Sequence, residues 1–366
     1  MLRIWKNIDT SGDATMTTNL LGIMTNHIGN PRRFHPHAQA AVSAGFSGVL
    51  LFVPQGVRLL GKRIDGYMYT PGRGWVKTSR EYPVAAIDIG YYTKPETVQR
   101  SIRVKQATPI RFTGFASGNK WTIQQHLLAS EALKPHLLPT IPMRSTGDAI
   151  AFAKEHGTIM IKPINGKGGK GIMKLTRAGT GWALVRNGRS VVSGSEPTVR
   201  SALRLAAGGG KYLLQRWIDI RNPEGRVYDI RSLVQKDGSG QWVITGTAVR
   251  EGARNSITSN ISGGGRAYET KAYLEKLFDP DKTSELLDKI EFLSGHIPAH
   301  LEADYGKRFA EFGLDFAVDR SGALWLLEAN IKPGKSVIRK VYGDEAAKRC
   351  FRLHYQFARY LAVNPK

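Results

Sequence analysis

The segment at residues 313–334, GLDFAVDRSGALWLLEANIKPG, constrains this chain more than any other part of the sequence. Two runs of alternating polar and apolar residues flank the turn sequence DRSG at 319–322, a pattern that predicts a β-hairpin. Side chains alternate between the two faces of a strand, so one face of this hairpin is expected to be apolar. That predicted core face carries Leu314, Phe316, Val318, Trp325 and Leu327.

The other face of the hairpin is predicted to carry two carboxylates and an amide. If Val318 pairs with Ala323, then Asp315, Glu328 and Asn330 project to the same side. Asp315 and Glu328 then lie diagonally across the two strands, roughly 7–8 Å apart at Cα. Hard oxygen ligands held by a rigid sheet suit Mg²⁺. The alternative is that these residues form the solvated outer face of an ordinary amphipathic hairpin.

The composition is that of a folded protein in a reducing compartment. The 366 residues are enough for two or three domains, and 41% of them are hydrophobic. Cys350 is the one cysteine, so an intramolecular disulfide framework is excluded. The first residues lack the apolar core of a signal peptide, and no run approaches the ~18 apolar residues of a membrane helix. We therefore expect a cytosolic protein without a membrane span.

The chain is strongly basic. It has 53 lysines and arginines against 30 acidic residues, a formal net charge of +23. This excess favours an acidic partner, which includes nucleic acid, a polyanionic peptide or an anionic surface. The basic residues are spread along the chain, which fits a broad positive field better than a discrete nucleic-acid-binding arm. A solvated basic surface without a dedicated partner is the alternative.

The pattern of apolar runs predicts an α/β unit at the N-terminus. Strands are expected at 19–25, 48–53 and 84–90, a helix at 37–44 and a hairpin at 57–70, whereas residues 91–116 resemble an irregular basic connection. Further helices are expected at 121–132, from Ser145 to Gly157, at 283–305 with an interruption at Pro298, and at 343–361.

A glycine-rich loop lies in the segment IMIKPINGKGGKGIMKL at 159–175. Its G-x-G-x-x-G match is not that of a dinucleotide-binding fold, because a second strand and not a helix follows it. The segment instead predicts a hairpin that folds over phosphates, with close backbone approach at the glycines and charge from Lys167 and Lys170. Lys162 is expected within the first strand. A flexible basic loop is the alternative.

A second long hairpin is predicted from VYDIRSLVQ at 227–235 and QWVITGTAVR at 241–250. In this register Asp229 and Arg231 share a face with Arg250, which indicates a ligand site or a salt-bridge network. An exposed sheet face is the alternative. The sequence SITSNISGGG at 256–265 adds hydroxyl groups and Asn260, a composition that suits an active-site loop.

Together these segments resemble the ATP-grasp superfamily, in the style of RimK-type ligases and glutathione synthetases. The resemblance is greatest to the YheC/YheD-type ATP-grasp proteins of endospore-forming bacteria. Six motifs carry it, in the order of the family: NKW at 119–121, IKPINGKGGKGI at 161–172, LQRWI at 214–218, YDIR at 228–231, SITSN at 256–260, and GLDF with LLEANIKPG within 313–334.

The resemblance implies an α/β (α+β) architecture of the ATP-grasp fold. It places an N-terminal α/β domain at residues 1–100 and the ATP-grasp domain at 101–366. Within the latter it implies a lid subdomain at about 158–215 and a C-terminal metal-binding subdomain at about 216–366. The motifs cover the second of these domains, and residues 1–100 resemble the family less distinctively.

The resemblance also implies a role for each motif residue. The phosphates of ATP would meet Lys120 and Lys162, under a lid of Gly166, Lys167, Gly168, Gly169, Lys170 and Gly171. The adenine pocket would be lined by Gln215, Arg216, Trp217 and Ile218, with Asp229 near the nucleoside. The transferred phosphate or the acyl intermediate would face Arg250 and Asn260, and the metal ligands would be Asp315, Glu328 and Asn330. Arg216 departs from RimK-type chains, which usually have an acidic residue there.

The activity implied by the resemblance is ATP-dependent ligation of a carboxylate to an amine through an acyl phosphate. The cofactors would be ATP and one or two Mg²⁺ ions, with Mn²⁺ as an alternative ion. The substrate would be an acidic small molecule, peptide or protein, and the family resemblance adds an association with spores. One alternative is a non-catalytic ATP-binding spore-coat protein. A second is a nucleic-acid-binding protein, supported by charge alone.

Overall fold

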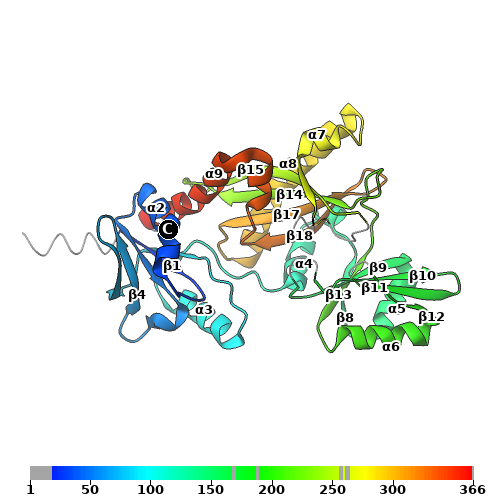
Figure 1. Cartoon of the computed structure of the whole chain (residues 1–366), viewed down its shortest axis with the longest axis horizontal. Helices are drawn as coiled ribbons and strands as arrows, with labels where there is room; N and C mark the ends of the chain where they lie inside the picture. Colours follow the sequence, from blue (N-terminus) through cyan, green and yellow to red (C-terminus); the bar gives the residue numbers. More distant parts are fainter. Residues whose placement is uncertain (1–18, 167–169, 187–188, 255–258, 260–263, 365–366) are drawn as a thin grey trace, which may run out of the picture.

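Three β-sheets follow one another along the chain in the computed structural model. It describes residues 19–364 apart from 167–169, 187–188, 255–258 and 260–263. The first and second sheets lie at opposite ends of the long axis, and the third lies between them (Figure 1). No helix within these described ranges is long and apolar enough to cross a membrane.

The first sheet is built around a parallel centre. Its strand order is β3-β4-β2-β1-β6-β7, with β5 paired to β4. β1 and β2 are apolar and buried along their whole length, as expected of parallel strands covered on both faces. The strands are β1 (Leu20–Met24), β2 (Gly48–Phe52), β3 (Val57–Arg58), β4 (Arg63–Thr70), β5 (Gly74–Glu81), β6 (Ala85–Asp88) and β7 (Arg111–Phe112).

Helices cover both faces of this sheet. α2 (His35–Ser43) packs on Leu21 and Ile23, whereas α3 (Pro95–Ala107) packs through Val104 on Met24 and its neighbours. The short 3₁₀ helices are η1 (Pro31–Phe34), η2 (Pro54–Gly56) and, later in the chain, η3 (Lys134–His136).

The second sheet is antiparallel, in the order β12-β11-β10-β9-β13-β8. Two helices, α5 (Thr146–His156) and α6 (Glu196–Ala207), share one apolar core with it. α5 begins with a reciprocal capping box between Ser145 and Asp148, as the sequence predicts. The strands are β8 (Thr140–Met143), β9 (Thr158–Pro163), β10 (Met173–Ala178), β11 (Gly181–Arg186), β12 (Arg189–Gly194) and β13 (Tyr212–Arg216).

The third sheet, in the order β16-β15-β14-β17-β18, has one apolar face and one mixed face, on which the apolar Leu233 and Ala248 accompany charged residues. Its apolar face packs on α4 (Lys120–Leu128), α7 (Thr270–Leu274) and the long helix α8 (Pro280–Tyr305), which together form the largest core. The strands are β14 (Tyr228–Lys236), β15 (Trp242–Glu251), β16 (Arg266–Glu269), β17 (Glu311–Val318) and β18 (Leu324–Ile331).

The last helix, α9 (Ser336–Val363), joins the third sheet to the first. Its start packs Val337 and Ile338 on the third sheet, and its end packs Tyr355 and Ala358 on the first. The helix is kinked at Gly343, whose φ of 80° is non-helical. The segment after the kink corresponds to the helix predicted at 343–361, and a further helical segment that begins at Ser336 precedes it.

Two other predictions about elements need correction. Residues 91–116 are not an irregular connection, because they contain α3 and the strand β7. α8 is not interrupted at Pro298, since the residues on both sides of it bury one apolar stripe. That burial outweighs the cost of a proline inside a helix, about 3 kcal/mol. The proposed domain boundary at residue 100 falls within the range of α3, and the second sheet begins at Thr140, before the proposed start of the lid at about 158.

The hairpin of β17 and β18 forms, but its register differs from the predicted one. Val318 pairs with Leu324 and not with Ala323, and a bulge at Leu327 shifts the rest of the ladder. Asp315 consequently lies directly opposite Glu328 instead of diagonally across from it.

The register shift at the turn also changes which side chains enter the core. Leu324 and Leu326 join Leu314, Phe316 and Val318 in the main core. Trp325 and Leu327, which were predicted there, lie outside it: the indole of Trp325 donates to Asp319 at 2.7 Å, and Leu327 packs in a small separate cluster.

Candidate functional site

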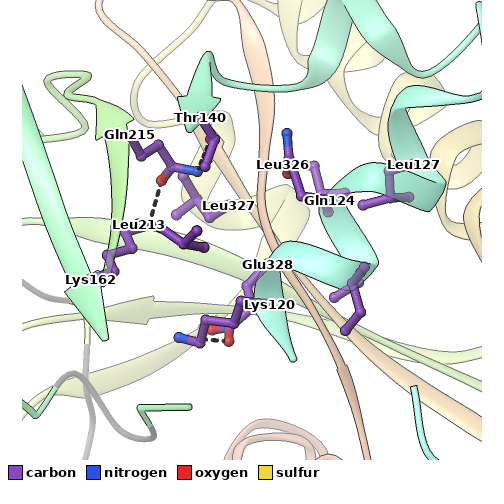
Figure 2. Close-up of a pocket in the computed structure, with 12 residues that line it drawn as sticks. Lys120, Gln124, Leu127, Thr140, Lys162, Leu213, Gln215, Leu326, Leu327 and Glu328 are labelled. Atoms are coloured by element: carbon purple, nitrogen blue, oxygen red, sulfur yellow. Dashed lines mark hydrogen bonds and ion pairs between the residues drawn. The ribbon is translucent and has the colours of Figure 1, made fainter. Parts of the chain in front are cut away.

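A cleft opens where α4, the second sheet and β18 meet (Figure 2). α4 contributes Lys120 and apolar side chains, the second sheet contributes Lys162 and Gln215, and β18 contributes Glu328. The walls formed by α4 and by the second sheet therefore each combine one lysine with aliphatic side chains. The remaining lining residues are Ile123, Gln124, Leu127, Thr140, Leu213, Leu326, Leu327 and Ala329.

Lys162 projects from β9 into this cleft. Its ammonium group donates a hydrogen bond to Gln215 on β13, and the amide of Gln215 donates to Thr140 Oγ at 3.0 Å. Burial first, and then Lys120, lower the pKa of Lys162 to about 8, although Glu328 and Asp315 oppose the change. The cleft thus holds a lysine whose charge is costly without a nearby anion.

Lys120 lies at the start of α4. The side chain of Asn119 caps that helix by accepting hydrogen bonds from the backbone N–H groups of Trp121 and Thr122. Lys120 extends to Glu328 on β18, with 2.9 Å between Nζ and Oε1. This ion pair joins α4 to the third sheet at the floor of the cleft, where the sequence predicts phosphate and metal contacts.

The glycine-rich segment forms the predicted hairpin of antiparallel strands β9 and β10. Gly166 donates its backbone N–H to Pro163 at 3.1 Å. Gly171 has a φ of 75°, a conformation that favours glycine. Lys167, Gly168 and Gly169 lie outside the described residues. Lys170 is described and exposed.

The predicted adenine segment, residues 215–218, begins in the last residues of β13 and continues into the loop that follows this strand. Gln215 lines the cleft, whereas Arg216 stacks over Trp325 and Trp217 is covered by Lys174. The backbone N–H groups of Arg216 and Trp217 donate to Pro139 and Thr158. Ile218 packs in the small apolar cluster beside Leu327. The structure therefore brings one of the four side chains into the cleft.

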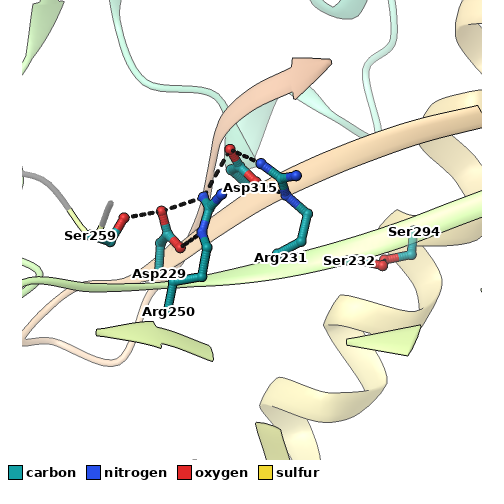
Figure 3. A network of polar contacts seen from close by, with 7 residues as sticks. All are labelled: Asp229, Arg231, Ser232, Arg250, Ser259, Ser294 and Asp315. Carbon is teal, nitrogen blue, oxygen red and sulfur yellow. Dashed lines mark hydrogen bonds and ion pairs between the residues drawn. The ribbon is translucent and has the colours of Figure 1, made fainter. Parts of the chain in front are cut away.

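A buried charge network crosses three strands of the third sheet next to the cleft (Figure 3). Arg250 on β15 makes two hydrogen bonds of 2.6 Å to Asp229 on β14. It also contacts Asp315 on β17 at 3.0 Å, and Arg231 pairs with the same carboxylate. Ser259 donates to Asp229. All of the predicted charged residues of this face are thus in one chain of contacts.

The arginines keep Asp315 ionised. Burial alone raises the pKa of its carboxyl group, but Arg250 and then Arg231 outweigh it and lower the pKa below the usual range. With Asp229 included, two arginines face two carboxylates, so the formal charges of the network balance.

The predicted metal ligands share one face of the hairpin. Asp315 lies directly across from Glu328, and Asn330 lies across from Gly313. In this structure both carboxylates have cationic partners, Asp315 the two arginines and Glu328 the lysine of α4. No cluster of three or more histidine, cysteine or acidic side chains arises in the described part of the chain. The set of two carboxylates and an amide nonetheless has the chemistry of a hard-cation site.

Some site residues were not anticipated from the sequence. Thr140 and Gln124 line the cleft, but they stand outside every motif and only the fold brings them there. Ser259 contacts Asp229, and its place beside Asn260 in a hydroxyl-rich loop was the available signal. Asn260 itself lies outside the described residues.

A comparison with protein families matches residues 109–361 to the model described as YheC/D-like ATP-grasp. Among curated proteins, the endospore coat-associated protein YheC of Bacillus subtilis (strain 168) is 27% identical over 74% of this chain and 76% of its own length. YheD of the same organism is 28% identical over 67% of this chain, and the match spans about half of its length, 54%.

Solved structures of ATP-grasp enzymes share the fold. D-cycloserine synthetase DcsG superposes with a TM-score of 0.55 at 15% identity, over 95% of this chain and 100% of that chain. D-alanyl-alanine synthetase A of Vibrio cholerae gives a TM-score of 0.53 at 14% identity, over 92% and 99% of the two chains. At these identities the similarity extends to the fold alone.

Proposed function

The chain belongs to the YheC/D-like ATP-grasp family, and from that membership we propose that it is a Mg²⁺/ATP-dependent carboxylate–amine ligase. The observation that carries the proposal is the position of the cleft. Lys120 and Lys162 line it, and the network around Arg250 and Asp315 lies on the adjoining sheet face. Phosphoryl transfer needs this combination of fixed cations and carboxylates around one point.

In the proposed reaction, a carboxylate oxygen of the acid attacks the γ-phosphorus of ATP, and ADP leaves. An amine then attacks the acyl carbon, phosphate leaves, and the amine nitrogen gives up a proton. Lys162 and Lys120 would hold the phosphates, because each is a cation in a partly dry cleft. Arg250 would stabilise the negative charge that spreads over the transferring group.

The metal would be held by Asp315, Glu328 and Asn330. A bound Mg²⁺ supplies charge neutralisation for the phosphates. Two of the cations that now pair with Asp315 and Glu328, namely Arg250 and Lys120, are also assigned to the phosphates. Phosphate binding therefore gives Lys120 and Arg250 a competing anionic partner, which favours freeing the carboxylates for the metal.

The glycine hairpin between β9 and β10 would cover the phosphates and exclude water, which otherwise hydrolyses an acyl phosphate. Gln215 would mark the adenine end of the cleft. Asn260 would act near Arg250, as the family resemblance implies. The acid and the amine are not specified by this site, since fold does not fix substrate.

The second candidate is an ATP-binding coat protein without catalytic activity. It is favoured by the names of YheC and YheD, which describe association with the endospore coat. Spore association is compatible with either candidate, so turnover is the property that separates them.

The test is release of ADP from Mg²⁺-ATP across a panel of amino acids and acidic peptides, with products identified by mass spectrometry. The ligase predicts ADP release that depends on one acid–amine pair and yields the corresponding amide. Glu328→Gln is the matched variant, because it keeps the size of the side chain and removes its charge. Nucleotide binding without ADP release for any pair would favour the coat-protein candidate.

A further inference from the structure

A second cavity, of about 200 Å³, lies where the first sheet meets α9 and the end of β18. It shares no lining residue with the nucleotide cleft. Side chains from α2, β6, β17, α9 and the loop after β18 converge on it, the principal ones being His37, Asp88, Glu311, Lys332, Lys335 and Phe351. No role in the proposed reaction has been given to any of them.

The charged groups of this cavity do not balance. Asp88 pairs with Lys105 at 2.8 Å and with Lys332 at 3.2 Å. Glu311 pairs with Lys335 at 2.7 Å. Both carboxylates are almost fully buried, with 4% and 7% of their side chains exposed. With Lys105, which pairs with Asp88 from outside the cavity lining, three ammonium groups therefore surround two carboxylates.

The two histidines of the cavity do not alter this balance at neutral pH. Burial first, and then Lys335, lower the pKa of His37 to about 4. Burial also lowers the pKa of His354 to about 4, although Glu311 opposes it. His37 is hydrogen-bonded to the hydroxyl of Tyr355. Both rings are thus neutral, and the excess of one positive charge remains.

An unbalanced positive charge in a partly buried site favours an anionic ligand. Lys332 and Lys335 are the cations that solvent or a ligand reaches, with 33% and 24% of their side chains exposed. Apart from the paired carboxylates Asp88 and Glu311, the rest of the lining is apolar or aromatic and includes Ile89, Pro333 and Phe351. This combination suits a small molecule with one anionic end and an apolar body.

The cavity borders the face of the third sheet that carries the charge network. A Cβ on Gly313 would lie 2.7 Å from Pro333 Cβ and 3.1 Å from a guanidinium nitrogen of Arg231. Glu311, Gly313 and Asp315 alternate on one strand and so share a face. Glu311 and Asp315 are four residues apart, which corresponds to about 13 Å along the strand.

We propose that this cavity binds a small monoanionic carboxylate, held between Lys332 and Lys335 with its apolar part against Phe351. Because Lys335 contacts Glu311, about 13 Å along the strand from Asp315, we assign the bound carboxylate as a recognition group and not as the one that is phosphorylated. The further statement that this molecule is a substrate of the ligase rests on the proposed function. Binding itself does not.

The test measures binding of benzoate and propionate to the full chain by saturation-transfer NMR in the absence of nucleotide. Benzamide and propionamide have nearly the same shapes without the charge. We expect both carboxylates to bind and the amides to fail. Lys332→Gln should weaken carboxylate binding by about tenfold or more, because it removes a charge-assisted contact. Lys340→Gln, the same change at an exposed position of α9, should have no effect.

A second variant guards against an effect through folding. Phe351→Leu keeps the cavity apolar but removes the aromatic face, so benzoate should lose more affinity than propionate. Each variant is checked for its thermal midpoint and for its response to Mg²⁺-ADP, which should match wild type. Equal binding of acids and amides, no carboxylate binding at 50 mM (about −2 kcal/mol at best), or an unchanged affinity in Lys332→Gln would overturn the proposal.

These results separate the cavity from the ligase. Carboxylate binding that depends on Lys332, without any ligation, would leave the cavity standing and remove the proposed function. Ligation of an acid–amine pair without carboxylate binding at Lys332 would do the reverse.

Discussion

Lys162 has the most informative surroundings of any single residue in the cleft. It stands in a strand, hydrogen-bonded to Gln215, with its pKa lowered to about 8 by burial and by Lys120. A lysine held this way is poorly compensated in the free protein. An anion such as a nucleotide phosphate compensates the charge of the Lys162 ammonium group, so phosphate binding and the protonation of Lys162 are linked.

The first prediction is that Lys162→Ala abolishes most of the stabilisation by nucleotide. A ligand that binds only the folded state raises the thermal midpoint by mass action. Wild type should therefore melt at a higher temperature with Mg²⁺-ADP, whereas the variant should melt as the apoprotein does. Lys154→Ala, at an exposed lysine of α5, is the control. A full nucleotide response in Lys162→Ala would contradict the assignment.

The second prediction concerns pH. In the free protein Lys162 is mainly protonated below pH 8 and mainly neutral above it, given its pKa of about 8. Only the protonated form attracts phosphate, so ADP affinity should fall as pH rises through 8, by at most about one log unit per pH unit. Lys162→Arg, which stays charged, should show no such fall. Calorimetric titrations from pH 6.5 to 9.5 decide between the two outcomes.

At the scale of single residues, the sequence predicted which charged side chains share a strand face, but it did not predict ion pairs between residues of different elements. The alternation of Asp229 and Arg231 opposite Arg250 was readable from strand periodicity, and the structure confirms that face. The ion pair of Lys120 with Glu328 joins residues that are far apart in sequence. Such a contact depends on the position of α4 relative to the third sheet, and no local sequence pattern specifies that position.

Among the elements, the hairpin of β17 and β18 determines the geometry of the metal-ligand candidates. Its bulge at Leu327 brings Asp315 and Glu328 directly opposite one another. Alternation predicted the hairpin and the shared face, but it contains no signal for one extra residue. The same limit applies to α3, which packs on the first sheet as a helix where the sequence predicted an irregular connection. It also applies to α8, whose packing keeps the helix continuous through Pro298.

The third prediction follows from that hairpin. Glu328→Gln and Asp315→Asn should abolish turnover, because metal charge matters most while negative charge is redistributed. Both variants should retain part of the affinity for nucleotide, which the lysines supply. Crystals of wild type with Mg²⁺ and nucleotide should show metal–oxygen distances of about 2.0–2.1 Å to these side chains. A metal bound away from the hairpin would rule out this assignment.

At the scale of the whole molecule, the nucleotide cleft lies between the second and third sheets, the second cavity lies between the first and third sheets, and α9 joins the last sheet to the first. The order of motifs along the chain predicted this architecture well. Two elements from outside residues 1–100, β7 and α9, also pack on the first sheet. We propose a boundary between the N-terminal part and the ATP-grasp part near residue 113.

The fourth prediction concerns the net charge of +23. If the basic field attracts an acidic substrate, the KM for that substrate should rise steeply with salt, while the KM for ATP changes less. Exposed charges are screened beyond about 8 Å at physiological salt, so long-range attraction is lost first. The nucleic-acid alternative instead requires tight binding of DNA or RNA without ATP, with a log-linear decrease in salt. A gel shift that persists at physiological salt, with no ADP release, would support that alternative.

The most direct test of the central claim follows an oxygen atom from the acid to phosphate. The protein is incubated with Mg²⁺-ATP, an amine and an acid labelled with ¹⁸O in its carboxylate, and both products are read by mass spectrometry. An acyl phosphate predicts one amide and one labelled phosphate per ADP in wild type, and neither in Glu328→Gln. Amide formed with unlabelled phosphate, or ADP released without any amide across the whole panel, would contradict the account.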